Sequence, residues 1–171
     1  MDGYIKEGLS EFQHIPSKQF QYGPSKLEIP DYGAKIQYVK YNVSALLAPN
    51  EIKRIQKVVG EFLFMGRVLD STVSHALNDI ACTVTKSTKA TIHAMTCFLN
   101  YIASNPLPSI MCRASNMILY VVSDAAYLVS PKVRNRTGGF HYLGSNDGSY
   151  TIQCTSICTG NGLKKCQGLS S

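Results

Sequence analysis

Carboxylate side chains are scarce in the second half of this 171-residue chain. Glu61 is the last glutamate, and only Asp124 and Asp147 follow Asp79. Hydrolysis of nucleic acid by paired metal ions needs a cluster of about four acidic side chains drawn from separate elements. The second half of the chain therefore cannot build a complete site of that kind.

Long apolar runs and a signal sequence are missing as well. No run approaches the roughly 20 apolar residues of a membrane-spanning helix. The first residues, MDGYIKE, lack the basic and then apolar regions of a secretory signal peptide. We therefore expect an intracellular protein, cytoplasmic or nuclear, without a membrane partner.

The cysteines lack the spacing of zinc ligands. Cys154, Cys158 and Cys166 lie near one another, with His141 upstream. Structural zinc sites use two pairs of ligands, each pair separated by about two to four residues. Free thiols in a reducing compartment are therefore favoured over a metal site.

Positive charge is present in moderate excess. Lys and Arg number 17 against 11 acidic residues, for a formal net charge of +6. An excess of this sign favours a polyanionic partner such as nucleic acid. The basic residues are scattered along the chain, so charge alone identifies no binding surface.

Residues 1–49 show no sustained hydrophobic period. Prolines and glycines interrupt the segment repeatedly. Its many aromatic residues argue against disorder, because such side chains favour packing. We expect an extended arm that lies on a larger surface.

Three stripes of apolar residues at helical spacing predict a helical segment over residues 50–108. The expected starts of the helices are near Asn50, Asp70 and Ser87, which have the side chains of helix N-caps. The third helix is expected to end before Pro106. Packing of the helices on one another is the expected role of the three stripes.

After Pro108 the pattern changes to β-rich runs. Strands are expected over 117–129, 137–143 and 149–158, with a turn at 144–148. The final residues show no period, and we expect them to be irregular. A helical half followed by a β half predicts an α+β fold.

Asp124 lies inside the apolar, β-branched run of residues 117–129. Burying an ionised carboxylate among apolar groups is costly unless a cation or hydrogen-bond donors meet it. A metal ion is one candidate, although Mg²⁺ takes oxygen ligands from more than one carboxylate in most sites. The alternative is a residue at the end of the strand that is hydrogen-bonded to a loop. The lack of further acids favours this alternative.

Short segments in a fixed order resemble one family. They are GYI at 3–5, FQH at 12–14, GPSK at 23–26, YGAK at 32–35, EIKRIQKVVG at 51–60, GRVLDST at 66–72, HALND at 75–79, FLNY at 98–101, ASNM at 114–117, SDAAYL at 123–128, RNRTGG at 134–139 and YLG at 142–144. Together they make the chain resemble the C-terminal part of a copia-type retrotransposon polyprotein, in which the reverse transcriptase continues into its ribonuclease H domain.

The resemblance implies a fold and a partner. It divides the chain into the extended arm (1–49), a helical connection or thumb-like segment (50–108) and a partial ribonuclease H-like antiparallel β-sheet (109–171). A polymerase palm would lie upstream, and the partner would be an RNA–DNA hybrid or other nucleic acid.

The resemblance also implies site residues. Asp124 would be the remnant of the catalytic site and a ligand of Mg²⁺, the family's cofactor. Arg134 and Arg136 would lie in the hairpin that follows, near the backbone of the hybrid. A solvated turn is the alternative interpretation of the two arginines.

The chain departs from the family in several places. Serine is common in the family where Ala126 stands, and the match fades past Gly148. The helix that carries a catalytic glutamate after the sheet has no counterpart. We therefore expect a catalytically incomplete fragment of such a polyprotein. A non-catalytic basic nucleic-acid-binding module and a helical interaction module are the alternatives.

Overall fold

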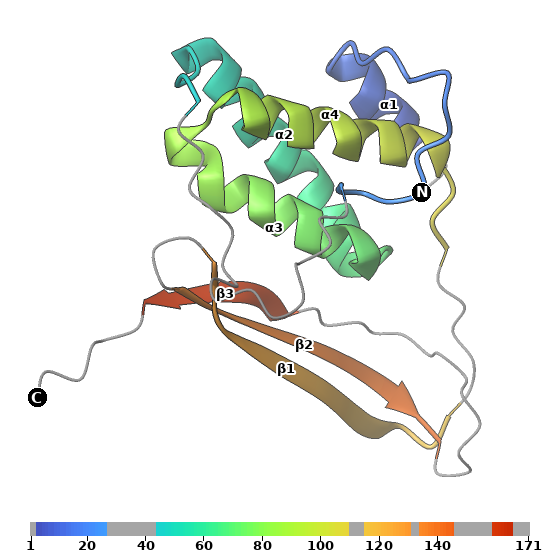
Figure 1. The fold of residues 1–171 in the computed structure, drawn as a ribbon. Helices are drawn as coiled ribbons and strands as arrows, with labels where there is room; N and C mark the ends of the chain where they lie inside the picture. The colour runs from blue at the N-terminus through green and yellow to red at the C-terminus, as the bar shows by residue number, and fades with distance from the viewer. Residues whose placement is uncertain (1–2, 27–43, 110–114, 131–133, 146–158, 166–171) are drawn as a thin grey trace, which may run out of the picture. The chain divides into compact units, whose positions relative to one another are not determined.

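The computed structural model consists of two compact units (Figure 1). It describes residues 3–26, 44–109, 115–130, 134–145 and 159–165. The first unit, called here the helical unit, contains Met1–Leu27 and Val43–Ile110, and the second, the sheet unit, contains Glu28–Asn42 and Met111–Ser171. Helices in one unit and an antiparallel sheet in the other confirm the predicted α+β class.

The helical unit contains four described α-helices, which are α1 (Tyr4–Glu11), α2 (Pro49–Val68), α3 (Ser74–Thr83) and α4 (Lys89–Ser104). Asp70 caps the short 3₁₀ turn before α3, because its side chain accepts a hydrogen bond of 3.0 Å from the Thr72 amide. Asn50 lies inside α2 instead of capping it, since Pro49 takes the first helical position. A membrane-spanning length of apolar residues is found in none of the described helices.

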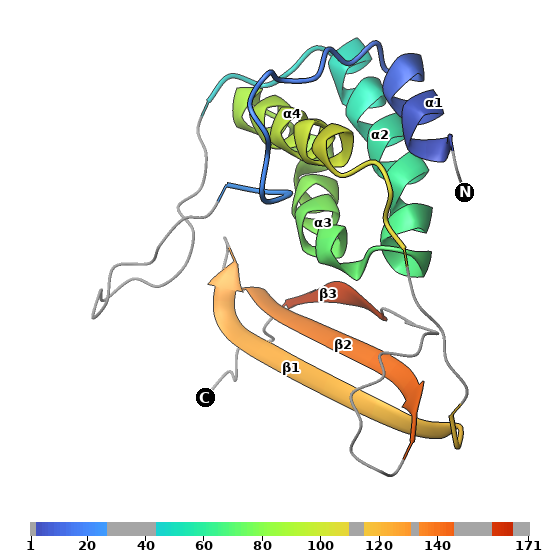
Figure 2. The ribbon, with the colours of Figure 1, turned by 90° about the vertical axis from the view of Figure 1, so that its right-hand side faces the viewer.

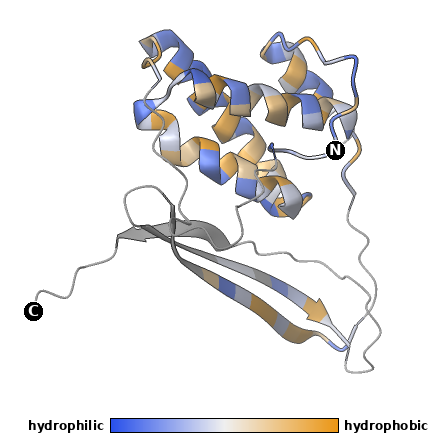
Figure 3. Ribbon diagram, viewed as in Figure 1, coloured by the Kyte–Doolittle hydropathy of each residue, from blue (hydrophilic) through white to orange (hydrophobic). Residues whose placement is uncertain are grey.

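Phe62 of α2 lies at the centre of the core of the helical unit. Its buried ring contacts the rings of Tyr4, Phe12 and Phe98, with centroid separations of 6.4, 6.3 and 5.5 Å. Hydrophobic residues recur along each helix in Figure 3, as expected for helices that bury one side. The three predicted stripes do pack in this core through Ile55, Val58, Phe62, Val73, Ala76, Leu77, Ile80, Val84, Met95, Phe98, Leu99 and Ile102.

The N-terminal segment is helical where the sequence predicted an extended arm. Residues Tyr4–Glu11 form α1, which contacts α4 and lies beside α2 in Figure 2. Ile5 and Gly8 of the helix and Phe12 after it are buried, which is the spacing of one helical face. A helix of eight residues is marginal by itself. Packing on the core therefore stabilises α1, and the short stripe gave too weak a pattern to predict it.

The segment that follows α1 takes the predicted course along a larger surface. Asn100 of α4 accepts a hydrogen bond of 3.2 Å from the Ser17 amide through Oδ1. Ser104, at the end of the same helix, accepts one of 3.1 Å from the Gln21 amide. The described part of the arm therefore lies on α4. Residues 27–43 of the predicted arm lie outside the described residues.

The sheet unit contains β1 (Ile118–Ser130), β2 (Arg134–Gly144) and β3 (Thr159–Lys165) in the antiparallel order β1-β2-β3. The first two strands confirm the predictions for 117–129 and 137–143, whereas the strand predicted at 149–158 lies outside the described residues. Part of the tail that was expected to be irregular forms β3. Its sequence, TGNGLKK, has low β propensity, so pairing with β2 determines this strand.

Candidate functional site

Asp124 lies in the middle of β1, opposite Gly138 of β2. Its side chain is exposed, and Oδ1 accepts a hydrogen bond of 2.8 Å from the amide of Ala125. The expected burial of this carboxylate is therefore wrong. The expected position at a strand end with a loop partner is also wrong. A solvated carboxylate needs no cation to compensate for burial.

A metal ion at Asp124 would require further ligands from other elements. In the part of the chain that the structure describes, no three His, Cys, Asp or Glu side chains lie close enough together to hold one. Asp147 and the cysteines Cys154, Cys158 and Cys166 lie outside the described residues. The described residues do not fit Mg²⁺, which takes several oxygen ligands. No catalytic step follows from them.

Two stacked tyrosines lie on the same side of the sheet as Asp124, four residues along β1 with Val122 between. Tyr120 and its cross-strand partner Tyr142 have ring centroids 5.2 Å apart and planes inclined by 12°. The Tyr120 hydroxyl donates a hydrogen bond of 3.1 Å to the Ser145 carbonyl. A Cβ on Gly144 would lie 2.9 Å from the Tyr120 ring, so glycine is needed there. These contacts hold the register of the β1–β2 hairpin.

Basic residues gather by register at one end of the β2–β3 pair. Arg134 and Arg136 belong to β2 of the β1–β2 hairpin and not to a turn. Arg134 pairs with Lys165 of β3, and Lys164 pairs with the residue between the two arginines. Neither lysine was predicted, because the tail that contains them was expected to be irregular. Four basic positions therefore lie near one another on two strands.

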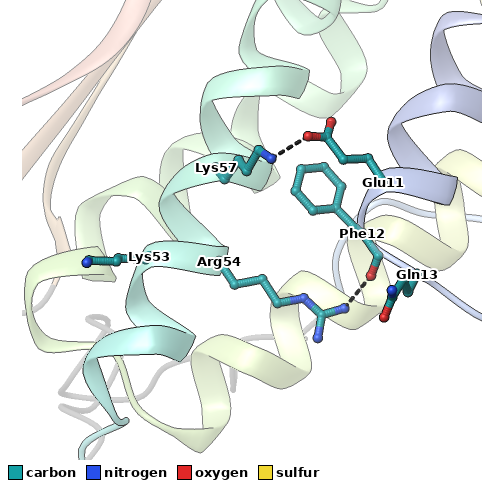
Figure 4. A pocket seen from close by; sticks show the side chains of 6 residues that line it. All are labelled: Glu11, Phe12, Gln13, Lys53, Arg54 and Lys57. Atoms are coloured by element: carbon teal, nitrogen blue, oxygen red, sulfur yellow. Dashed lines mark hydrogen bonds and ion pairs between the residues drawn. The ribbon is translucent and has the colours of Figure 1, made fainter.

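A hollow of about 380 Å³ lies in the helical unit, between the end of α1 and α2 (Figure 4). It is lined by Glu11, Phe12, Gln13, Lys53, Arg54 and Lys57. Arg54 Nη2 donates a hydrogen bond of 2.7 Å to the Phe12 carbonyl, and Lys57 forms an ion pair with Glu11. These residues were not predicted from the sequence. The spacing of the basic residues along one helix was the signal that could have found them.

Comparisons with family models, with curated proteins and with solved structures find no match to this chain. The resemblance to retrotransposon polyproteins therefore stays a prediction from the residues.

Proposed function

We propose that the chain is a fragment of a copia-type retrotransposon polyprotein, from the end of the reverse transcriptase into a partial ribonuclease H domain. Support comes from the ordered segments over residues 3–144 and from the succession of a helical unit and an antiparallel sheet. In this proposal the sheet is ribonuclease H-like. Asp124, on its first strand, is the remnant of the catalytic site.

The proposed present activity is binding of nucleic acid without cleavage. The observation that carries this proposal is the charge along the sheet. Asp124 is the one acidic residue in the three described strands, whereas Arg134, Arg136, Lys164 and Lys165 are basic. Lysine and arginine neutralise backbone phosphates and release counterions. The resemblance makes an RNA–DNA hybrid the proposed partner.

Cleavage is tested with the purified chain, Mg²⁺ and an end-labelled RNA–DNA hybrid. We expect no hydrolysis by the wild-type chain or by Asp124→Asn, because one carboxylate cannot hold two metal ions. Clear cleavage by the wild type that is lost in Asp124→Asn would overturn the proposed catalytic incompleteness.

Binding is tested by fluorescence anisotropy with the same hybrid at increasing salt. We expect the affinity to fall steeply as salt increases. The variant Arg134→Glu/Arg136→Glu should bind the hybrid about tenfold more weakly or worse. The matched control is Lys86→Glu/Lys89→Glu, which changes the net charge equally in the helical unit. Binding that is insensitive to salt, or absent at low salt, contradicts the proposal.

The proposed origin has its own test in the DNA that flanks the coding segment. An upstream polymerase palm and a downstream segment that encodes a glutamate-bearing helix are expected, in any reading frame. Unrelated sequence on both sides of an intact genomic copy would count against a retroelement origin.

A further inference from the structure

The hollow beside α2 carries more positive charge than the described residues neutralise. Lys53, Arg54 and Lys57 contribute three cations, and Glu11 contributes the one carboxylate among the lining residues. Lys57 is paired with Glu11, which leaves two positive charges uncompensated. Lys53 is exposed and has no hydrogen-bond or ion-pair partner in the ranges that the structure describes. The hollow is therefore suited to an anion.

Arg54 has hydrogen-bond donors to spare. Its Nη2 donates to the Phe12 carbonyl at 2.7 Å. A guanidinium presents several N–H donors in a planar fork, and the others have no partner among the described residues. In Figure 4 the guanidinium lies next to Gln13, with one nitrogen directed away from Phe12. The hydrogen bond to Phe12 thus fixes the guanidinium in place, while its other N–H groups can donate to a ligand.

Gln13 holds a backbone conformation that glycine adopts more easily. Its φ is 49°, in the left-handed region, and it directly follows Phe12, the C-cap of α1. A side chain is sterically disfavoured in that region, and glycine is the usual residue just after a helix. The exposed side-chain amide of Gln13 lines the hollow and brings two N–H donors next to Arg54.

We propose that this hollow binds a phosphate group of a nucleic-acid backbone. The spare donors of Arg54 and the amide of Gln13 contact the phosphate oxygens. Lys57, on the next turn of α2, is neutralised by Glu11. Lys53, which extends away from Arg54 in Figure 4, adds attraction at the rim.

The shape and lining of the hollow favour the backbone over the bases as the bound group. Phe12 is 5% exposed, so it offers no aromatic face on which a base could stack. The hollow is open to solvent, as the path of a polymer requires. The choice of nucleic acid as the ligand rests on the proposed function, whereas the anion site rests on the hollow alone.

The site is tested first with inorganic phosphate and the ¹⁵N-labelled full chain. We expect saturable shifts of the backbone amide resonances of residues 13 and 54 as phosphate is added. In Gln13→Gly the shifts of the same two resonances should be much smaller. The thermal midpoint of Gln13→Gly should equal or exceed that of the wild type, because glycine relieves the left-handed strain. Weaker binding by a more stable variant separates a contact with the ligand from a structural role.

Nucleic-acid binding is tested next with the labelled RNA–DNA hybrid. We expect Gln13→Gly to weaken binding about tenfold or more, as for loss of one hydrogen bond to a charged group. Lys53→Glu should weaken it and lower the slope of log affinity against log salt by about one. The control is Lys6→Glu, with the same charge change on an exposed residue that does not line the hollow.

The outcomes separate the two proposals. Equal weakening by Lys53→Glu and Lys6→Glu would show that diffuse charge binds the hybrid, and would overturn the phosphate site. Absence of phosphate-induced shifts at Gln13 and Arg54 would overturn it as well. Saturable phosphate shifts in a chain that does not bind the hybrid would support the anion site and contradict the proposed function.

Discussion

Arg54 Nη2 of α2 donates a hydrogen bond of 2.7 Å to the carbonyl oxygen of Phe12, the C-cap residue of α1. The last carbonyls of a helix have no partner within it. A residue 42 positions further along the chain thus supplies the donor that completes α1. The same guanidinium faces the hollow, so stability of the N-terminal helix and binding of an anion share one side chain.

Loss of the Arg54 side chain should loosen α1. We expect Arg54→Ala to lower the free energy of unfolding by about 1–2 kcal/mol, because a partly exposed hydrogen bond from a charged donor is lost. Urea denaturation followed by circular dichroism measures the change. Lys53→Ala, one residue away and without a partner in the described ranges, should stay within about 0.5 kcal/mol of the wild type. Equal effects of the two variants would contradict this role for Arg54.

Two phenylalanines two residues apart on α2 should differ widely in their contribution to stability. Phe62 is fully buried among three other aromatic rings, whereas Phe64 is 52% exposed. We expect Phe62→Ala to cost about 3–5 kcal/mol, through lost burial and the cavity left behind. Phe64→Ala should cost less than about 1 kcal/mol. Chemical denaturation of both variants measures the difference, and similar costs would show that the core is placed wrongly.

Two glycines of α2 should respond to alanine in opposite directions. A Cβ on Gly60 would meet nothing within 4 Å, whereas a Cβ on Gly66 would lie 3.0 Å from Val73 Cγ2 and 3.3 Å from Leu77 Cδ1. Gly60→Ala should stabilise the chain by about 0.5–1 kcal/mol, because alanine is the better helix former. Gly66→Ala should destabilise it by about 1–3 kcal/mol through overpacking. Thermal midpoints of the two variants test the signs.

Local periodicity predicted the parts of the fold that repeat over several turns or a long strand. The apolar spacing of Ile55, Val58 and Phe62 continues through α2, so the pattern was sufficient there. By contrast, α1 has about two turns, and its form depends on a core supplied by distant residues. The same holds for Thr159–Lys165, a strand that exists through its pairing with β2.

The candidate sites were less predictable because each depends on contacts between distant segments. The apolar run around Asp124 was taken to imply burial, yet β1 lies at the edge of the described sheet, and Leu119 is 62% and Val121 55% exposed on it. Arg134 and Arg136 were identified, but their proximity to the β3 lysines follows from register and not from any motif. The hollow needs α1 and α2 side by side, which no pattern in either helix predicts.

Tyr4 links α1 to the middle of α2 and makes the stability of the chain depend on pH in the alkaline range. Its hydroxyl donates a hydrogen bond to the carbonyl oxygen of Glu61. Burial, and then the neighbouring Glu61 charge and hydrogen bond, raise the pKa of Tyr4 above its ordinary value of 10.0. The folded chain therefore keeps this proton more tightly than the unfolded chain does.

The sign of the resulting pH dependence is fixed by that difference. Below a pH of about 10, Tyr4 is protonated in both the folded and the unfolded chain, and its contribution to stability is complete. Between the pKa of the unfolded chain and the raised pKa of the folded chain, the free energy of unfolding falls as pH rises. Tyr4→Phe should be less stable at neutral pH by about 1 kcal/mol, for the lost hydrogen bond, and should lose less stability on alkalinisation. Urea denaturation from neutral pH to above pH 10 measures both effects. Tyr22→Phe, at a tyrosine that is 87% exposed, should retain the wild-type alkaline loss. Parallel pH profiles for Tyr4→Phe and the wild type would contradict the proposed linkage.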